Sequence, residues 1–349
     1  MKKLLVVFLS TLSFLINAQS DPNLKWLHPS PQGWDLRWVK MWDASNWYLC
    51  GDYGSFLKTT DAGQTWTTKN NAGWPNPSYP EIHTNWHANE AWFFDQNNGI
   101  VVGSNTAGIL KTTDGGETFD TLSILSGTNS GKNIYSIYFV NSNLGFISGN
   151  TAYKVHQTTD GGNSWTQLSN LPDGTYNDVY ASDALNIITC STLGLIYKTT
   201  DGGNNWTPIQ VPTLQTLYDI EFTSPTNGYV CGGAGFFKMT TDGGATWTGG
   251  TNTPAGMTNY KIKVINNEVY VAGNDTMIFK TTDNGSSWTN LQMTTDGSMI
   301  GASYCMDVVG ANIVVAGIRG YIYKSVNSGS DWDVLLDRET DGSFFRSFY

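Results

Sequence analysis

The sequence has few basic residues, and arginine in particular is scarce. The 349-residue chain contains 19 lysines and arginines against 29 acidic residues, which gives a net charge of −10. Proteins that bind nucleic acid or anionic membrane surfaces neutralise phosphates with clusters of lysine and arginine, and no such cluster occurs here. We therefore expect neither nucleic acid nor an anionic membrane surface as a partner.

Long apolar runs are also missing after the first residues. The one sustained run, Leu4 to Ile16, follows Lys2 and Lys3 and precedes Ala18, which is typical of an export signal cleaved before Gln19. It is shorter than the ~20 apolar residues that span a bilayer, and no cysteine beside the cleavage site offers a lipid anchor. We expect residues 1–18 to be a signal peptide and the protein to be secreted or periplasmic, without membrane insertion.

Signatures of catalysis are absent as well. The chain has no Gly-x-Ser-x-Gly, no His-Glu-x-x-His and no paired cysteines at zinc spacing. His156 stands alone in a predicted strand, where a packed side chain is the simpler interpretation. We expect no catalytic residue, no metal and no cofactor.

Cysteine is scarce, with four in the chain. Cys50, Cys190 and Cys231 occupy matching places in "YLCGDYG", "IITCSTLG" and "YVCGGAG". Equivalent positions of neighbouring repeats lie further apart than the ~7 Å between Cα atoms that a disulfide allows. We therefore predict buried free thiols, Cys305 included.

What the sequence does contain is one short pattern written seven times. The copy "KTTDGGNNWT" begins at Lys198, and its Asp or Asn recurs at intervals of 53, 46, 41, 41, 41 and 44 residues. A period in the low forties indicates a repeat architecture. The recurring positions are Asp61, Asp114, Asp160, Asp201, Asp242, Asp283 and Asn327.

Each repeat is composed of four strand-like segments. The fifth reads "LYDIEF", "GYVCG", "GFFKMTT" and "TWTGG", with alternating apolar residues and β-branched side chains between Gly, Asn and Pro. Four antiparallel strands per forty-odd residues are typical of a β-propeller blade. We predict an all-β, monomeric protein in which residues 35–336 form a seven-bladed β-propeller.

The repeated pattern is interpreted as the turn between the third and fourth strands of each blade. Its Asp can accept hydrogen bonds from backbone N–H groups two or three residues later, and the Thr or Ser two residues before it can hydrogen-bond across the hairpin. Its second glycine, present in all seven copies, indicates a left-handed backbone. The closing Trp or Phe is expected to pack into the blade.

These residues match the Asp-box motif, Ser/Thr-x-Asp-x-Gly-x-Thr/Ser-Trp/Phe, so the chain resembles the Asp-box β-propellers. Among these, "YDIEFTSPTNGYVCGGAGFFKMTTDGGATW" is similar to the repeat of the photosystem II stability/assembly factor type. That resemblance implies boxes at the periphery, away from the ligand site. It also implies a non-enzymatic scaffold that binds partner proteins.

An enzyme of the same superfamily is the alternative. Resemblance to the sialidases would imply an arginine triad, but the four arginines of this chain (37, 319, 338 and 346) include no such motif. A glycoside hydrolase or lyase with an unrecognised site is left open, since such enzymes need two carboxylates at a defined separation. Asp178, Asp219, Glu221 and Asp307 fall on first strands, which line a propeller channel, and we interpret them as lining it.

The binding site is predicted in the unusually long interval after the first box. Residues 70–90, "NNAGWPNPSYPEIHTNWHANE", connect two blades on the face opposite the boxes and are rich in aromatic and polar side chains. Such side chains contact sugar rings or partner proteins, although they also suit blade packing, as expected for Trp38, Trp42 and Trp92. The candidates for binding a protein or glycan on this face are Trp74, Tyr79, His83, Trp86 and His87.

Both ends of the chain resemble parts of a further repeat. Residues 19–34 contain "LKWLHPSP", which is similar to a fourth strand, and residues 337–349 resemble the entry to the seventh blade. They are interpreted either as strands that help to close the ring or as the start of a longer array.

Overall fold

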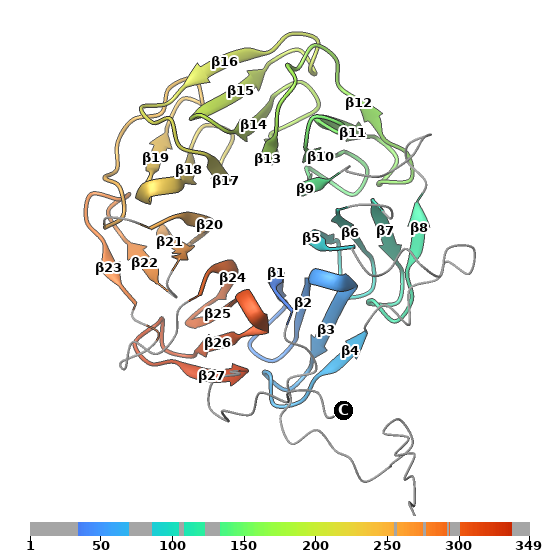
Figure 1. Ribbon diagram of the computed structural model, residues 1–349, viewed down its shortest axis with the longest axis vertical. Helices are drawn as coiled ribbons and strands as arrows, with labels where there is room; N and C mark the ends of the chain where they lie inside the picture. Colours follow the sequence, from blue (N-terminus) through green and yellow to red (C-terminus); the bar gives the residue numbers. More distant parts are fainter. Residues whose placement is uncertain are drawn as a thin grey trace, which may run out of the picture.

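Seven small antiparallel sheets surround a central channel, like blades (Figure 1). The computed structural model describes residues 34–69, 86–104, 108–122, 133–254, 257–274, 277–291, 293 and 301–336. The predicted seven-bladed β-propeller is confirmed. Within the described residues, no helix is long and apolar enough to cross a membrane.

The blades follow one another along the chain, and in Figure 1 the first strand of each lies nearest the channel. The first strands are β1 (Leu36–Met41), β5 (Ala88–Phe93), β9 (Ile134–Phe139), β13 (Tyr176–Ala181), β17 (Leu217–Phe222), β20 (Asn259–Ile265) and β24 (Ser303–Val309). The second are β2 (Trp47–Gly51), β6 (Gly99–Gly103), β10 (Gly145–Gly149), β14 (Ile187–Ser191), β18 (Gly228–Gly232), β21 (Glu268–Gly273) and β25 (Asn312–Gly317). The third are β3 (Ser55–Thr59), β7 (Ile109–Thr112), β11 (Val155–Thr158), β15 (Leu195–Thr199), β19 (Phe237–Thr240), β22 (Ile278–Thr281) and β26 (Ile322–Ser325). The outermost are β4 (Thr67–Lys69), β8 (Asp120–Leu122), β12 (Thr166–Gln167), β16 (Thr207–Gln210), β23 (Thr289–Asn290) and β27 (Asp333–Leu336).

Blade five departs from this pattern at its outer edge. A single bridge between Met239 and Thr248 takes the place of a fourth strand. Gly249 and Gly250 follow with φ of 66° and 65°, a left-handed backbone that cannot continue an extended strand. Short 3-10 turns join the second and third strands of blades one, five and seven: η1 (Asp52–Gly54), η5 (Gly233–Gly235) and η7 (Ile318–Gly320).

The hydrophobic core lies between blades. Leu49 and Leu57 of blade one pack with Val314 and Ile322 of blade seven, and equivalent clusters fill the other junctions. The second strands are buried along their whole length in blades one to five because a neighbouring blade covers each face. All four cysteines are buried and free, as predicted.

The Asp box is a hydrogen-bonded turn, and its geometry differs in detail from the prediction. In blade one the Thr59 hydroxyl donates to Asp61 Oδ1 over 2.8 Å and accepts the Gly63 N–H over 2.9 Å, so it bonds within the turn and not across the hairpin. Asp61 accepts the Thr65 N–H, four residues later, over 2.8 Å. The Thr65 hydroxyl and N–H lower the pKa of Asp61 to about 2.

The second glycine of every box has a left-handed backbone, with φ between 79° and 87° across the seven copies. Only glycine adopts this conformation at little cost, which explains its presence in all seven boxes.

The ring closes by direct packing of blade seven against blade one. Asp307 Oδ2 accepts the Met41 N–H over 2.7 Å, and the Arg319 N–H donates to Asp35 Oδ1 over 2.8 Å. Residues 19–33 and 337–349 lie outside the described residues, so an additional closing strand from either end stays a prediction.

Candidate binding site at the channel mouth

Every first strand begins with a β-bulge, and the seven bulge residues surround one cavity. In blade one the partner of Leu36 is Gly51 and that of Trp38 is Cys50, so Arg37 has no partner in the ladder. The same shift recurs in all the other blades. A cavity of about 100 Å³ is lined by all seven bulge residues: Arg37, Asn89, Tyr135, Asn177, Tyr218, Tyr260 and Tyr304.

The cavity lies at the end of the channel opposite the Asp boxes. The boxes follow the third strands, whereas the bulges stand at the start of the first strands. In an antiparallel blade the first strand starts where the third strand starts, at the other end from the boxes. This is the face on which the binding site was predicted.

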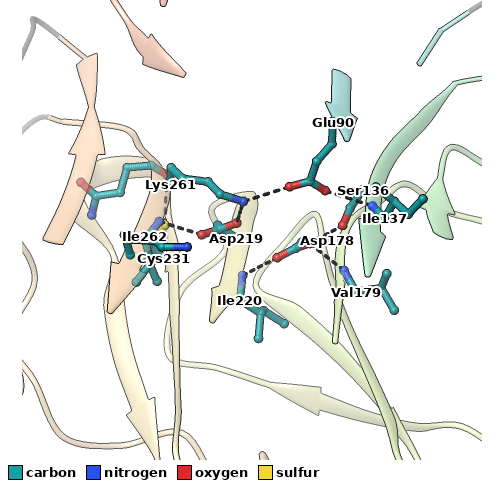
Figure 2. A network of polar contacts seen from close by, with 12 residues as sticks. Glu90, Ser136, Ile137, Asp178, Val179, Asp219, Ile220, Cys231, Lys261 and Ile262 are labelled. Carbon is teal, nitrogen blue, oxygen red and sulfur yellow. Dashed lines mark hydrogen bonds and ion pairs between the residues drawn. The ribbon is translucent and has the colours of Figure 1, made fainter. Parts of the chain in front are cut away.

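The floor of the cavity contains an ion-pair network that crosses the channel (Figure 2). Lys261 Nζ lies 2.7 Å from Asp219 Oδ1 and 3.2 Å from Glu90 Oε1, which extends from blade two towards Lys261 of blade six. Burial of Lys261 opposes its charge, but Asp219, Glu90 and Asp178 outweigh burial and hold its pKa well above the ordinary value. Lys261 is therefore a fixed cation.

The same carboxylates link neighbouring blades through backbone N–H groups. Asp219 Oδ2 accepts the Ile262 N–H over 2.7 Å, and Glu90 Oε2 accepts the Ile137 N–H over 3.0 Å. Each bond runs from one blade to the first strand of the next. Their evident role is to position blades.

Asp178 is bonded differently from Asp219. It accepts the Ser136 hydroxyl over 2.5 Å and the N–H groups of Val179 and Ile220 over 2.9 and 2.8 Å. Burial and the charge of Asp219 raise its pKa well above the usual range. Asp178 therefore resists ionisation, although Lys261 partly offsets this.

Aromatic side chains form an arc along one side of the rim. The rings of Tyr218 and Tyr260 are 5.0 Å apart, and those of Tyr260 and Tyr304 are 5.3 Å apart, in edge-to-face contacts. The Arg37 guanidinium lies over the Tyr304 ring at 5.6 Å. We call Tyr218, Tyr260 and Tyr304 the tyrosine arc.

A charged cluster continues the rim where blade one meets blade two. Asp52 Oδ1 lies 2.5 Å from Arg37 Nε and 2.9 Å from His87 Nδ1. Burial raises the pKa of Asp52, but the bonds from His87 and Arg37 outweigh burial and lower it. Tyr53 packs between Trp34 and His87, with ring centroids 4.0 and 5.3 Å away.

The predicted site residues fall in different places. Trp74, Tyr79 and His83 lie outside the described residues. His87 lies at the rim, whereas Trp86 is 3% exposed and belongs to a hydrophobic cluster with Trp38 and Phe56. No observation tests whether these residues bind a ligand, so their role stays a prediction.

Several other aromatic side chains and His156 were predicted to pack inside the protein rather than to bind a ligand. Trp38 is in the core, and Trp42 and Trp92 are half-buried against hydrophobic clusters. His156 is buried with its ring 5.8 Å from that of Tyr153, as expected for a packed side chain. The tyrosine arc was missed, although each member is the second residue of its observed first strand, as Tyr218 is in "LYDIEF".

Taken together, the boxes, blades and channel define an Asp-box β-propeller. The family model described as "Photosynthesis system II assembly factor YCF48" matches residues 74–209 and 204–346. The chain therefore belongs to this family. No functionally curated protein matches the sequence.

Solved structures with the same fold include two of YCF48. One, described as "YCF48 bound to D1 peptide", is 18% identical, has a TM-score of 0.66 and is matched over 85% of this chain and 95% of that one. YCF48 from Cyanidioschyzon merolae is 17% identical, with a TM-score of 0.62 and coverage of 85% and 96%. The GH74 xyloglucanase from Xanthomonas campestris is 12% identical, with a TM-score of 0.66, and is matched over 89% of this chain but 56% of the enzyme. At these identities the likeness shows the fold alone.

Proposed function

We propose that this protein is a non-catalytic propeller that binds an extended segment of a partner protein at the channel mouth. The observation that carries the proposal is the ring of seven bulge residues, one from each blade, around a single cavity. Its relative YCF48 has been solved with a D1 peptide, which supports a protein segment as the kind of ligand.

The size of the cavity favours a protein side chain over a small molecule. Pockets that hold a substrate or cofactor have volumes of roughly 300–1,000 Å³, several times the 100 Å³ found here. A cavity of this size accepts a few water molecules or the end of one side chain. The rest of a bound segment would lie across the rim.

The carboxylates of the channel favour binding over hydrolysis. A glycosidase uses one carboxylate as an acid and a second as a nucleophile or base, and both must reach the scissile bond. Asp178, Asp219 and Glu90 each accept at least one backbone N–H of a neighbouring blade, and Lys261 contacts two of them. These bonds hold the carboxylates in structural roles.

We further propose that the protein acts outside the cytoplasm. The support is the sequence of residues 1–18, with two lysines, an apolar run and Ala18 before Gln19. Expression of the full chain in a secreting bacterial host should yield exported protein that begins at Gln19. Retention in the cytoplasm with residues 1–18 intact would contradict this proposal.

A binding screen tests the function itself. The purified protein is incubated with an array of 12-residue peptides, an array of plant and bacterial glycans, and soluble polysaccharides assayed for released sugar. We expect peptide binding that weakens about tenfold or more in Tyr218→Ser, because the rim residue contacts the segment. The control Asp201→Ala, on the opposite face, should bind as the wild type does. Release of sugar, or peptide binding equal in Tyr218→Ser and wild type, would reject the proposal.

A further inference from the structure

The tyrosine arc is the most distinctive surface of the channel mouth. Its three members come from consecutive blades, five, six and seven, and all three are half-buried. Within the described residues none of their hydroxyl groups makes a hydrogen bond, whereas Tyr135 on blade three accepts one from Asn133. The arc therefore offers a row of ring edges and free hydroxyl donors.

The spacing of the rings suits one backbone conformation. A polyproline II helix repeats every three residues with a rise of about 3.1 Å per residue, so one turn is about 9 Å long. The ring centroids of Tyr218 and Tyr260 are 5.0 Å apart and those of Tyr260 and Tyr304 are 5.3 Å apart, so the whole arc is about as long as one turn of this helix. A β-strand repeats its same-face side chains about every 6.6 Å, which matches neither one step nor two.

The hydrogen-bonding groups of the tyrosine arc also suit a polyproline II segment. Proline has no N–H, so a proline-rich segment presents carbonyl acceptors that need donors. The tyrosine hydroxyls supply donors beside aromatic surface, the combination by which grooves lined with aromatic residues bind proline-rich segments. A flat sugar ring would need an open ring face, and the edge-to-face contacts of 64° and 68° partly cover the faces of these rings.

The charges around the arc favour a basic residue next to the part of the ligand that contacts the tyrosines. Apart from Asp178, which resists ionisation, four acidic side chains and three basic ones lie at the cavity and its rim, in a protein with a net charge of −10. Most of the basic groups already contact an acidic one, as Arg37 contacts Asp52 and Lys261 contacts Asp219. The acidic set is Asp35, Asp52, Glu90 and Asp219, and the basic set is Arg37, Lys261 and Arg319.

The geometry points to a proline-rich segment with an adjacent lysine or arginine as the ligand of the tyrosine arc. This inference rests on the proposed function and specifies its partner. The proline run lies along Tyr218, Tyr260 and Tyr304, and the basic side chain lies towards the acidic floor or rim, where the surplus of carboxylates complements its charge.

The test uses defined peptides with the mature protein. The probe is an acetylated peptide of eight prolines followed by two lysines, and the comparison peptides replace the prolines by Gly-Ser repeats or the lysines by glutamates. Titration calorimetry should show binding of the probe that is at least about tenfold tighter than binding of either comparison peptide.

Substitutions then locate the site. Tyr260→Ser should weaken the probe about tenfold or more, whereas Tyr260→Phe, which keeps the ring, should weaken it less. The matched control is Tyr135→Ser, a bulge tyrosine on the other side of the cavity, which should retain affinity within about twofold. Thermal melting of each variant checks that it is folded.

Several results would overturn the inference. They are an absence of probe binding, equal affinity for the Gly-Ser peptide, or an affinity unchanged in Tyr260→Ser. A xyloglucan oligosaccharide that binds the arc when the proline peptide does not would also overturn it. If the array shows proline-free peptides bound at the mouth, this inference fails while the proposed function stands.

Discussion

Asp307→Ala is expected to lower the free energy of unfolding by about 3–5 kcal/mol, because it removes a buried charge at the junction where the ring closes. Asp307 is 3% exposed. Its Oδ2 accepts the Met41 N–H of blade one over 2.7 Å, and its Oδ1 lies 3.3 Å from Lys263 Nζ. The substitution leaves that N–H without its acceptor and the lysine without its partner, and both losses are costly in a buried site.

Urea unfolding followed by tryptophan fluorescence measures this effect. Asp307→Asn keeps an acceptor for Met41 while it removes the charge, so it should cost less than Asp307→Ala. The control is Asp173→Ala, whose carboxylate is 80% exposed beside Lys154 and should contribute less than about 1 kcal/mol. If Asp307→Ala lowers the free energy of unfolding no more than the control does, the junction does not depend on this carboxylate.

The fold could be predicted because its information is local and repeated. Each box needs only about seven neighbouring residues to form its turn, as in Thr199, Asp201 and Gly203, where the Thr hydroxyl contacts both the carboxylate and the glycine N–H. Seven copies at a regular interval then specify seven blades. The backbone donor was predicted two or three residues after the Asp, whereas Asp201 accepts the N–H of Asn205, four residues later.

The sequence could predict which face of the propeller carries the candidate site, but not which residues form it. Those residues come together only when the ring closes. Glu90 and Lys261 are 171 positions apart and contact each other across the channel. The bulges also shift the register by one residue, which places Tyr218, Tyr260 and Tyr304 at the mouth, and no local pattern specifies a bulge. Of the predicted site residues that the structure describes, Trp86 packs in a hydrophobic cluster, and whether it also contacts a ligand stays a prediction.

The channel combines two requirements that explain its charged lining. Within the described residues, carboxylates on four of the first strands link a blade to the next through backbone N–H groups, as Asp178 links to Ile220 and Asp219 to Ile262. Gathering several carboxylates around a narrow axis is unfavourable unless a cation lies among them. Lys261 and Lys263 of blade six supply this charge, and Lys40 of blade one lies 4.0 Å from Asp307 Oδ2.

Lys261→Met is therefore expected to be strongly destabilising at neutral pH, by about 3–5 kcal/mol, because it leaves a buried carboxylate without its cation. Asp219, which is almost fully buried, loses the 2.7 Å contact, and Glu90 loses the 3.2 Å contact. Asp178, whose pKa is already raised by burial and by Asp219, loses the favourable charge of Lys261 as well. Lys261→Arg keeps the charge and should cost less.

The loss of stability caused by Lys261→Met should increase as the pH rises. Without the cation, burial and the charge of Asp219 hold the folded-state pKa of Asp178 still further above its unfolded value of about 4. The folded variant then binds more protons than the unfolded chain, so its stability falls as the pH rises from about 4 towards 7. Urea midpoints measured across this range should show a difference from wild type that is small near pH 4 and largest near pH 7. Lys111→Met, whose ammonium contacts the neutral amide of Asn163 at the surface, should show a small difference at every pH. A Lys261→Met cost that does not change with pH would show that loss of packing, and not uncompensated charge, causes it.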